Sequence, residues 1–431
     1  MRGVFLAALA AITPTLHGCS DFLLRTTGAS SDQVVSARTM DFYLDLKTVV
    51  EIVPRDTEIQ EPIVRGCPDC PDFAWRTKYG FVGLNSFGMN VAGDGLNEHG
   101  LSAASLWLTG SEYPPPATAD TSRPIVSSLT TYLLGNFATV DQVKAALVAI
   151  QVAEADPALQ ALVAPFGGGT EDSYPLHYAV HDAKGQSIAI EVLNGTIHVY
   201  DNPNGVLTNE PPFEQQLALV AAHDKAVGTG DKVFAGGYTP IERFQRLTFL
   251  NRHANAHFLA KTSYSTAAPD QAAIATAVHL INTVTIPTAY VDNDGATQYA
   301  VVRDHTHRRL FFLANENQLL RSIDLTQIDF ATASNRKALS VTFGDWHVDM
   351  TAVALASTDR SADMPPRSVV QGLLHGGAIQ SIDASSKAAV SNGSSFWMGL
   401  AAGIVGSVVV VNIVLLRMHR RFGRDEYVPL L

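Results

Sequence analysis

Cys19 is the residue of this sequence whose type and position offer the most direct chemistry. It follows Gly18, a small residue at the end of a short apolar N-terminal stretch, which is where a secretory signal peptide is cut. Cleavage after Gly18 would free the α-amine of Cys19 beside its thiol. In model compounds the thiol has a pKa of about 8.5 and the α-amine a pKa of about 8. The amine can then take the thiol proton, so one residue supplies both the nucleophile and the general base for acyl transfer.

Residues 1–18 have the features of a signal peptide, because Arg2 provides a positive charge and an apolar run follows from Val4 to Ile12. A second interpretation treats Leu16-His17-Gly18-Cys19 as a bacterial lipobox. Lipid attached to Cys19 would then exclude catalysis, although His17 fits that motif poorly. The mass of the mature N-terminal peptide separates the two interpretations.

The other two cysteines, Cys67 and Cys70, form a CxxC pair with no second pair in the chain. Behind a signal peptide this spacing predicts a local disulfide. A zinc site would need two more ligands, and His253 and His257 have no companions in the sequence. The glycines at 167–169 lack the strand-to-helix context of a phosphate-binding loop. We therefore expect neither a metal nor a cofactor.

The C-terminal part of the chain has the pattern of a membrane anchor. The stretch 396–416 contains no charged residue, and a helix of that length spans about 30 Å, the thickness of one bilayer core. Four arginines follow it within residues 417–431, so the positive-inside rule places this tail in the cytosol. Residues 357–395 are rich in Ser, Ala, Gly, Asp and Pro, which is typical of a stalk.

The end of the tail resembles two sorting signals. Glu426 stands before Leu430 and Leu431 as in an acidic dileucine signal, and Tyr427 stands three residues before Leu430 as in a tyrosine signal. Such signals are read by sorting adaptors. The sequence therefore predicts a type I single-pass membrane protein with a lumenal body, located in a lysosome or endosome or at the cell surface.

The composition limits the partners of the body. Against 41 Asp and Glu there are 30 Lys and Arg, a formal net charge of −11, which argues against binding to nucleic acid. Two N-glycosylation sequons begin at Asn194 and Asn392, both on the predicted lumenal side. Homo-oligomers are compatible with the sequence but not indicated by it.

The body, residues 19–356, alternates strand and helix patterns. The residues Asn194-Gly195 are typical of a two-residue hairpin turn between strands at 187–193 and 196–200. A helix is expected from Thr139 to about Ile150. Further strands are expected at these ranges: 34–37, 49–53, 176–181, 297–303 and 309–313.

Separated motifs give the body a resemblance to the choloylglycine hydrolase family, from Cys19 to about Phe330. In order, they are Cys19 itself, Ser36-Ala37-Arg38-Thr39-Met40-Asp41-Phe42, Asp94-Gly95-Leu96-Asn97-Glu98-His99-Gly100-Leu101, Leu207-Thr208-Asn209-Glu210-Pro211 and Glu242-Arg243-Phe244. The tract Leu106-Trp107-Leu108 looks most like the penicillin-acylase-like branch of Gram-negative bacteria. The resemblance implies an α+β fold, the four-layer αββα sandwich of N-terminal nucleophile hydrolases, to which this chain would add one transmembrane helix.

The resemblance also implies catalytic roles for five residues. Cys19 would be the nucleophile, with its α-amine held by Asp41 and its sulfur close to Arg38, which favours the thiolate. Asn209 would donate its side-chain amide to the oxyanion, and Arg243 would complete the polar cluster.

Two further positions belong to the predicted substrate and oxyanion site. A backbone N–H near Trp107 would be the second oxyanion donor, and the indole would form an apolar wall for the acyl group. Asn97 is expected at the same site through its motif.

The spacing of Arg38 and Asp41 raises a geometric difficulty. Residues three apart on a regular strand point to opposite faces, so both can reach Cys19 only if the strand ends or bulges near Thr39. Without the other motifs, an ordinary surface pair would be the simpler interpretation.

These observations predict an amidase that cleaves linear amide bonds of small N-acyl substrates through a thioester on Cys19. Penicillin V, conjugated bile salts and other N-acyl amides are the substrate types that the resemblance offers. The alternative is a non-catalytic membrane protein on the same fold, acting as a binding or sorting receptor.

Overall fold

The computed structural model describes residues 18–26, 32–43, 45–86, 91–117, 122–156, 173–227, 236–257, 268–288 and 295–356. The chain divides into two units, and the first contains every described residue up to Val348. The described part of the second contains the short helix α6 (Thr351–Ala356). Residues 1–17 of the predicted signal peptide, the stalk, the span 396–416, the tail and Asn392 lie outside the described residues. None of the described helices is long and apolar enough to cross a membrane.

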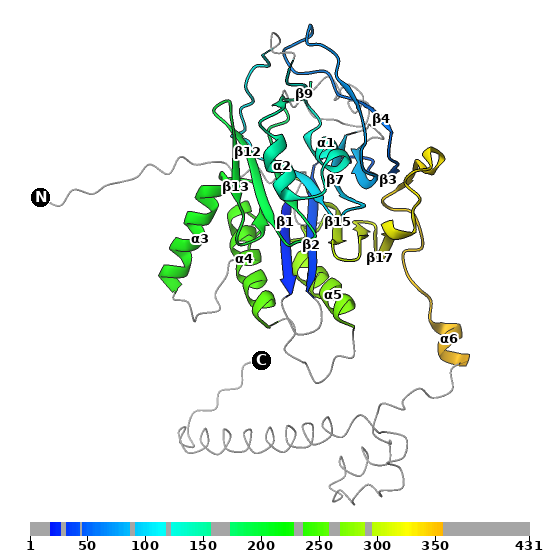
Figure 1. The fold of residues 1–431 in the computed structure, drawn as a ribbon. Helices are drawn as coiled ribbons and strands as arrows, with labels where there is room; N and C mark the ends of the chain where they lie inside the picture. Colours follow the sequence, from blue (N-terminus) through cyan, green and yellow to red (C-terminus); the bar gives the residue numbers. More distant parts are fainter. Residues whose placement is uncertain are drawn as a thin grey trace, which may run out of the picture. The chain divides into compact units, whose positions relative to one another are not determined.

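The first unit contains two large antiparallel sheets (Figure 1). The first sheet has six strands, in the order β14 (Val206–Leu207), β1 (Ser20–Thr26), β2 (Gln33–Phe42), β15 (Ala296–Asp304), β16 (Arg309–Ala314) and β17 (Asn317–Asp324). The central strand β2 is buried over nearly its whole length, because it is covered on both faces. This position explains why its sequence reads as a continuous strand with few exposed polar residues.

The second sheet has eight strands and lies against the first. Its order is β13 (Thr196–Asp201), β12 (Ser187–Leu193), β11 (Leu176–His181), β8 (Ser102–Trp107), β7 (Ala92–Asn97), β6 (Phe81–Asn85), β3 (Val49–Val53) and β18 (Lys337–Ser340). The turn between β12 and β13 contains Asn194 and Gly195 at φ 50° and 70°, the left-handed conformation that this dipeptide favours. The side chain of Asn194 is exposed there.

Helices cover the outer faces of both sheets. On the first sheet, α4 (Pro240–His257) packs on β1, α5 (Pro269–Asn282) packs on β2, and α3 (Phe213–Val227) packs on α4. On the second sheet, α1 (Leu129–Asn136) packs on β7 and β8, and α2 (Val140–Ala146) adds Val143 to the same apolar cluster. The order of layers is therefore helix, sheet, sheet, helix, and the predicted αββα arrangement of the body is confirmed (Figure 1).

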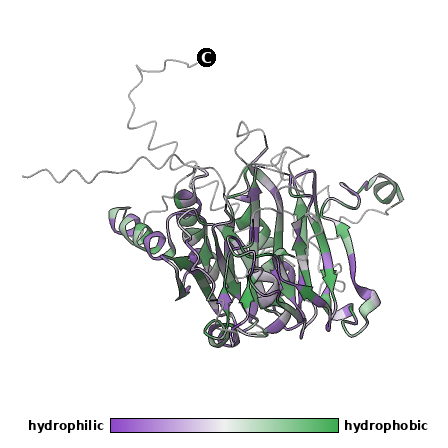
Figure 2. Cartoon of the chain, turned by 90° about the horizontal axis from the view of Figure 1, so that it is seen from above, coloured by the Kyte–Doolittle hydropathy of each residue, from purple (hydrophilic) through white to green (hydrophobic). Residues whose placement is uncertain are grey.

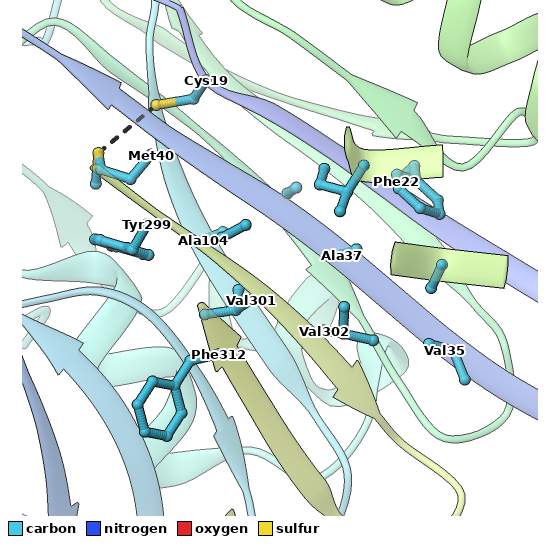
Figure 3. Packing of buried hydrophobic residues seen from close by; sticks show 14 of the residues in the cluster. Cys19, Phe22, Val35, Ala37, Met40, Ala104, Tyr299, Val301, Val302 and Phe312 are labelled. Carbon is cyan, nitrogen blue, oxygen red and sulfur yellow. Dashed lines mark hydrogen bonds between the residues drawn. The ribbon is translucent and has the colours of Figure 1, made fainter. Parts of the chain in front are cut away.

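Apolar side chains fill the spaces between these layers. Figure 2 shows that hydrophobic residues are concentrated on the strands in the middle of the first unit. Phe22, Ala37 and Val35 belong to one buried cluster with Phe244 of α4, and Figure 3 shows part of this cluster beside Cys19. Burial of such side chains is the main stabilising contribution to a fold of this kind.

Two small two-stranded sheets are found in addition to the two large ones. They pair β4 (Glu58–Gln60) with β5 (Ala74–Arg76), and β9 (Ile125–Val126) with β10 (Gln151–Val152). Between β4 and β5, a disulfide joins Cys67 and Cys70 with an S–S distance of 2.08 Å. Both cysteines pack against a small cluster that includes Ile125 and Ala153.

Candidate active site

The sulfur of Cys19 lies in the space between the two sheets. Cys19 directly precedes β1 and is almost completely buried. Its thiol is 3.8 Å from Sδ of Met40 and 3.5 Å from Nη2 of Arg38. The dashed line in Figure 3 marks the contact with Met40. Burial raises the pKa of the Cys19 thiol, and the nearby guanidinium of Arg38 opposes this effect.

Arg38 is held from several sides without exposure to solvent. Nη1 donates to Oη of Tyr299 at 3.1 Å, and Nη2 donates to the backbone carbonyl of Ser105 at 2.5 Å. The carboxylate of Asp94 is 3.6 Å from Nη1. The guanidinium therefore links the first sheet to the second directly beside the Cys19 sulfur.

Asp41 lies on the other face of β2. Its carboxylate accepts hydrogen bonds from Thr297 at 2.5 Å and from Thr39 at 3.2 Å, and it is 3.9 Å from Nη1 of Arg243. Burial raises the pKa of the Asp41 carboxyl to about 6, although Arg243 opposes this effect.

The predicted end or bulge of the strand near Thr39 is not found. Strand β2 continues to Phe42, and the irregularity lies on its neighbour β15, between Thr297 and Tyr299. Arg38 and Asp41 therefore point to opposite faces, as regular alternation requires. Both reach Cys19 because the side chain of Cys19 faces Arg38, whereas its backbone faces the helices on the Asp41 side.

Arg243 of α4 holds the backbone of Cys19 in place. Nη1 donates to the carbonyl of Cys19 at 2.7 Å and to Oγ of Ser20 at 2.5 Å, and Nε donates to the carbonyl of Tyr238 at 2.9 Å. Nη2 donates to Oδ1 of Asn209 at 3.0 Å. These contacts bring the residues of three predicted motifs together around one main-chain segment.

The side chain of Asn209 spans from α4 to the second sheet. Its Nδ2 donates to the carbonyl of Trp107 at 2.9 Å. The backbone N–H groups that follow Trp107 are engaged within the protein, because Leu108 donates to Pro175 and Thr109 donates to Glu210. Neither is therefore the second oxyanion donor that was expected near Trp107.

Asn97 lies apart from this cluster. Its Nδ2 donates to the carbonyls of Leu134 and Phe137, and its Oδ1 accepts from the backbone N–H groups of His99 and Leu101. The side chain thus organises the turn after β7 and the end of α1. It does not line the cavity beside Cys19, so its predicted place at the substrate is not supported.

A cavity of about 180 Å³ opens beside the sulfur. Cys19, Arg38 and Met40 form one end, and Trp107, whose ring centroid is 6.2 Å from that of Phe42, forms a wall. Most of the remaining lining is apolar or aromatic, including Leu46, Val91, Leu129, Ala155, Leu176 and Tyr178. The cavity can therefore accept an uncharged apolar group next to the Cys19 sulfur.

Two members of the site have no individual signal in the sequence. Met40 stands inside the motif around Arg38, which predicts no role for it, and Tyr299 belongs to a strand that only its residue pattern indicates. Among the described residues, no three His, Cys, Asp or Glu side chains are grouped to hold a metal ion.

Comparisons with known proteins agree with this geometry. Residues 19–338 match the model of the family described as linear amide C-N hydrolases, choloylglycine hydrolase family. A penicillin V acylase from Pectobacterium atrosepticum is 31% identical over 312 residues, which cover 70% of this chain and 79% of that protein. The structure of penicillin V acylase from Agrobacterium tumefaciens has 27% identity and a TM-score of 0.58, covering 73% of this chain and 88% of that one.

A second solved structure shares the fold. A mutant conjugated bile acid hydrolase from Clostridium perfringens has a TM-score of 0.58 at 20% identity, covering 76% of this chain and 97% of that one.

These comparisons contradict the predicted type I membrane protein of a lysosome, endosome or cell surface. The relatives just described are bacterial enzymes. That location is therefore corrected, and the predicted anchor and sorting adaptors do not enter the function proposed below.

The predicted hydrolase class is confirmed, since the family model of linear amide C-N hydrolases matches residues 19–338, most of the chain. The chain belongs to the choloylglycine hydrolase family of linear amide C–N hydrolases.

Proposed function

We propose that this protein is an amidase that hydrolyses N-acyl substrates through an acyl thioester on Cys19, after removal of residues 1–18 has freed its α-amine. One observation carries the proposal. The Cys19 sulfur faces Arg38 and an apolar cavity, while Arg243 holds the backbone of the same residue beside Asp41. A nucleophile, an acyl pocket and a site for the amine are thus brought together at one residue.

Gly18 supports the place of the α-amine. A Cβ atom on this residue would lie 2.5 Å from Nη2 of Arg243 and 3.4 Å from Oδ2 of Asp41. The chain before Cys19 therefore runs directly along both side chains. Once Gly18 is removed, a protonated amine at Cys19 would have the Asp41 carboxylate as its partner, which fixes the amine for proton transfer.

The proposed reaction has two halves. The α-amine takes the thiol proton, and the sulfur attacks the amide carbon to give a tetrahedral oxyanion that accepts a hydrogen bond from Nδ2 of Asn209. The α-ammonium returns the proton to the departing nitrogen, which leaves as an amine and leaves the acyl thioester on Cys19. A water molecule, deprotonated by the α-amine, then attacks the thioester, releasing the carboxylic acid and the thiol.

The cavity supports an apolar acyl group as the part of the substrate that binds next to the sulfur. Its charged lining residues, Arg38 and Asp41, both lie near Cys19, and most of the rest of the lining is apolar or aromatic. Phenoxyacetyl, steroid and fatty-acyl groups all have this character, so penicillin V, a glycine-conjugated bile salt and fatty-acyl amides form the substrate set to test first.

The experiment uses the full chain, with a free Cys19 verified by mass spectrometry of the N-terminal peptide. We expect at least one member of the substrate set to be cleaved near pH 5 or pH 7, and Cys19→Ser to abolish cleavage while the protein still folds. The double variant Cys67→Ser, Cys70→Ser is the matched control, because it removes the other cysteine sulfurs and should keep kcat, with a change expected only in KM for large acyl groups.

Three outcomes would contradict the proposal. Undiminished hydrolysis by Cys19→Ser would exclude the thioester, and a diacylglyceryl mass on Cys19 would favour the lipobox interpretation. Binding of these compounds without turnover by a protein whose N-terminus is free would favour the receptor alternative.

A further inference from the structure

Four buried charged or titratable side chains beyond Arg38 lie between the two sheets and have no role in the reaction above. The first sheet contributes Asp21 of β1 and Arg303 of β15, and the second contributes Asp94 of β7 and His181 of β11. All four are fully buried. Burying such groups costs several kcal/mol per ion, and apolar residues of similar size would often be as stable or more stable.

The side chains form one continuous series of contacts that starts at the nucleophile. Asp94 Oδ2 is 3.6 Å from Arg38 and 2.7 Å from Nη2 of Arg303. The same Nη2 donates to Oδ2 of Asp21 at 3.0 Å, and Oδ1 of Asp21 is 2.5 Å from Nε2 of His181. Because a carboxylate only accepts, His181 must donate through Nε2.

Formal charges alternate along this series, with two arginines and two carboxylates. Removing one arginine or one carboxylate would leave the series with one unbalanced buried charge, and no ionised side chain other than the two arginines contacts Asp94 among the described residues. Burial raises the pKa of the Asp94 carboxyl, whereas two guanidinium groups lower it. With both arginines in contact, the ionised form of Asp94 is the one that this arrangement stabilises.

We propose that Asp94 and Arg303 are positioning residues that set the protonation of Cys19 through Arg38: the buried carboxylates cancel the two arginine charges, so that Cys19 rests as a thiol rather than a thiolate. This inference rests on the proposed function, in which the α-amine must take a proton from the thiol. A resting thiol keeps that proton available at the reacting sulfur. Arg38 then orients the sulfur without ionising it before the substrate binds.

The other groups that face Cys19 do not replace this balance. Arg243 of α4 lowers the pKa of the thiol and Asp41 of β2 raises it, so the two oppose each other. Tyr299 of β15 stays neutral, because burial raises the pKa of its hydroxyl. His305 lies outside this series of contacts. Burial lowers the pKa of His305 to about 3, so its imidazole is also uncharged at neutral pH.

The test is a titration of the thiol and needs no substrate. Cys19 is the one free cysteine of the chain, so the thiolate absorbance of each protein minus that of its Cys19→Ser counterpart reports this thiol alone. Asp94→Asn removes a buried negative charge and should lower the pH midpoint of the Cys19 thiol titration by about one pH unit. Arg303→Gln removes a positive charge, so Arg38 becomes the single guanidinium left to balance Asp94 and Asp21. This should raise the pH midpoint of the Cys19 thiol by about as much.

The matched control is Glu191→Gln. Glu191 is a fully buried carboxylate that pairs with His177 at 3.0 Å in the same sheet and contacts none of these residues. Glu191→Gln should therefore leave the pH midpoint of the Cys19 thiol unchanged. Shifts of opposite sign in the two variants cannot come from a general loss of stability, which would move both in one direction.

The proposal is overturned if Asp94→Asn and Arg303→Gln, shown to be folded by their thermal unfolding, leave the midpoint in place or move it in the same direction. If Asp94→Asn fails to fold, Asp21→Asn takes its place, with a smaller shift to lower pH expected; if Arg303→Gln fails to fold, Arg303→Met takes its place, with the same shift to higher pH expected. Loss of the thioester mechanism would appear separately, as amidase activity that survives Cys19→Ser while the titration shifts still occur.

Discussion

Arg243 fixes which way the side-chain amide of Asn209 points, because its Nη2 donates to Oδ1 at 3.0 Å. A guanidinium only donates, so the amide oxygen must face Arg243 and the amide nitrogen must face the second sheet. There Nδ2 donates to Trp107 at 2.9 Å and has one further hydrogen to offer. An amide prepared in this way is a preorganised donor for an oxyanion.

Asn209→Ala should therefore lower kcat by about 100- to 1000-fold, the usual effect of losing one such donor, with a small change in KM. Steady-state kinetics on the best substrate measures this. Asn202→Ala is the matched control, since Asn202 is also buried and donates Nδ2 to the carbonyl of Val206, away from Cys19. Equal losses of kcat in both variants would mean that Asn209 acts only on the fold.

Asp41 should make the chain that retains Gly18 less stable as the pH rises. The pKa of the buried carboxyl is about 6, above its ordinary value, so the folded state binds a proton that the unfolded state releases. This contribution is complete below about pH 4 and is lost as the pH rises through 6, amounting to about 3 kcal/mol at most.

The measurement compares unfolding free energies of this chain and its Asp41→Asn variant between pH 4 and pH 7. The difference should fall with pH when Gly18 is present and change less after its removal, because the α-ammonium then favours the ionised carboxylate. A difference that does not vary with pH would contradict the raised pKa.

Ala155 lines the cavity, so a larger residue there should reduce the space for the acyl group. Ala155→Phe should raise KM by tenfold or more for a long or bulky acyl group and leave an acetyl or similarly small acyl amide unaffected. Val148→Phe, at a position that is 76% exposed, is the control. An equal effect on small and large acyl groups would place the acyl chain elsewhere.

Removal of the Cys67–Cys70 disulfide should lower the free energy of unfolding by about 2 kcal/mol, because the bond closes a loop of only four residues. Urea unfolding of the double Ser variant measures this. The loop packs near Ala153, which lines the cavity, so KM for large acyl groups should rise while the pH midpoint of Cys19 stays unchanged. A changed midpoint would mean that the loop influences the nucleophile directly.

Much of this arrangement could be predicted from the sequence. The predicted strands at 49–53, 176–181 and 187–193 coincide with β3, β11 and β12, since each combines alternating apolar residues with a clear turn signal. The helix expected from Thr139 is found as α2, and Oγ1 of Thr139 accepts from the N–H of Gln142 as an N-cap. It ends at Ala146, a turn earlier than its apolar pattern indicated.

Other features depend on contacts between distant strands, which a single sequence does not encode locally. The position of Asn97 followed from its motif, but four hydrogen bonds to the backbone show that the motif organises a turn. Asp94 lies on β7, in the other sheet from Arg38, so its contact with Arg38 could be found only from the packing of the two sheets. How Arg38 and Asp41 both reach Cys19 from opposite faces of β2 likewise became clear only from the position of Cys19 directly before β1.

The division of Cys19 between two layers has a consequence for how such an enzyme can diversify. Its main chain is held by α4, its sulfur by β2, and the far wall of its cavity by residues of α1 and of the segments around β10. Substitutions or insertions in these outer segments can change the shape of the cavity, and so the substrate that it accepts, without altering the residues around Cys19. Duplicated copies of this gene could thus acquire new substrates by small steps, each of which keeps a working catalyst.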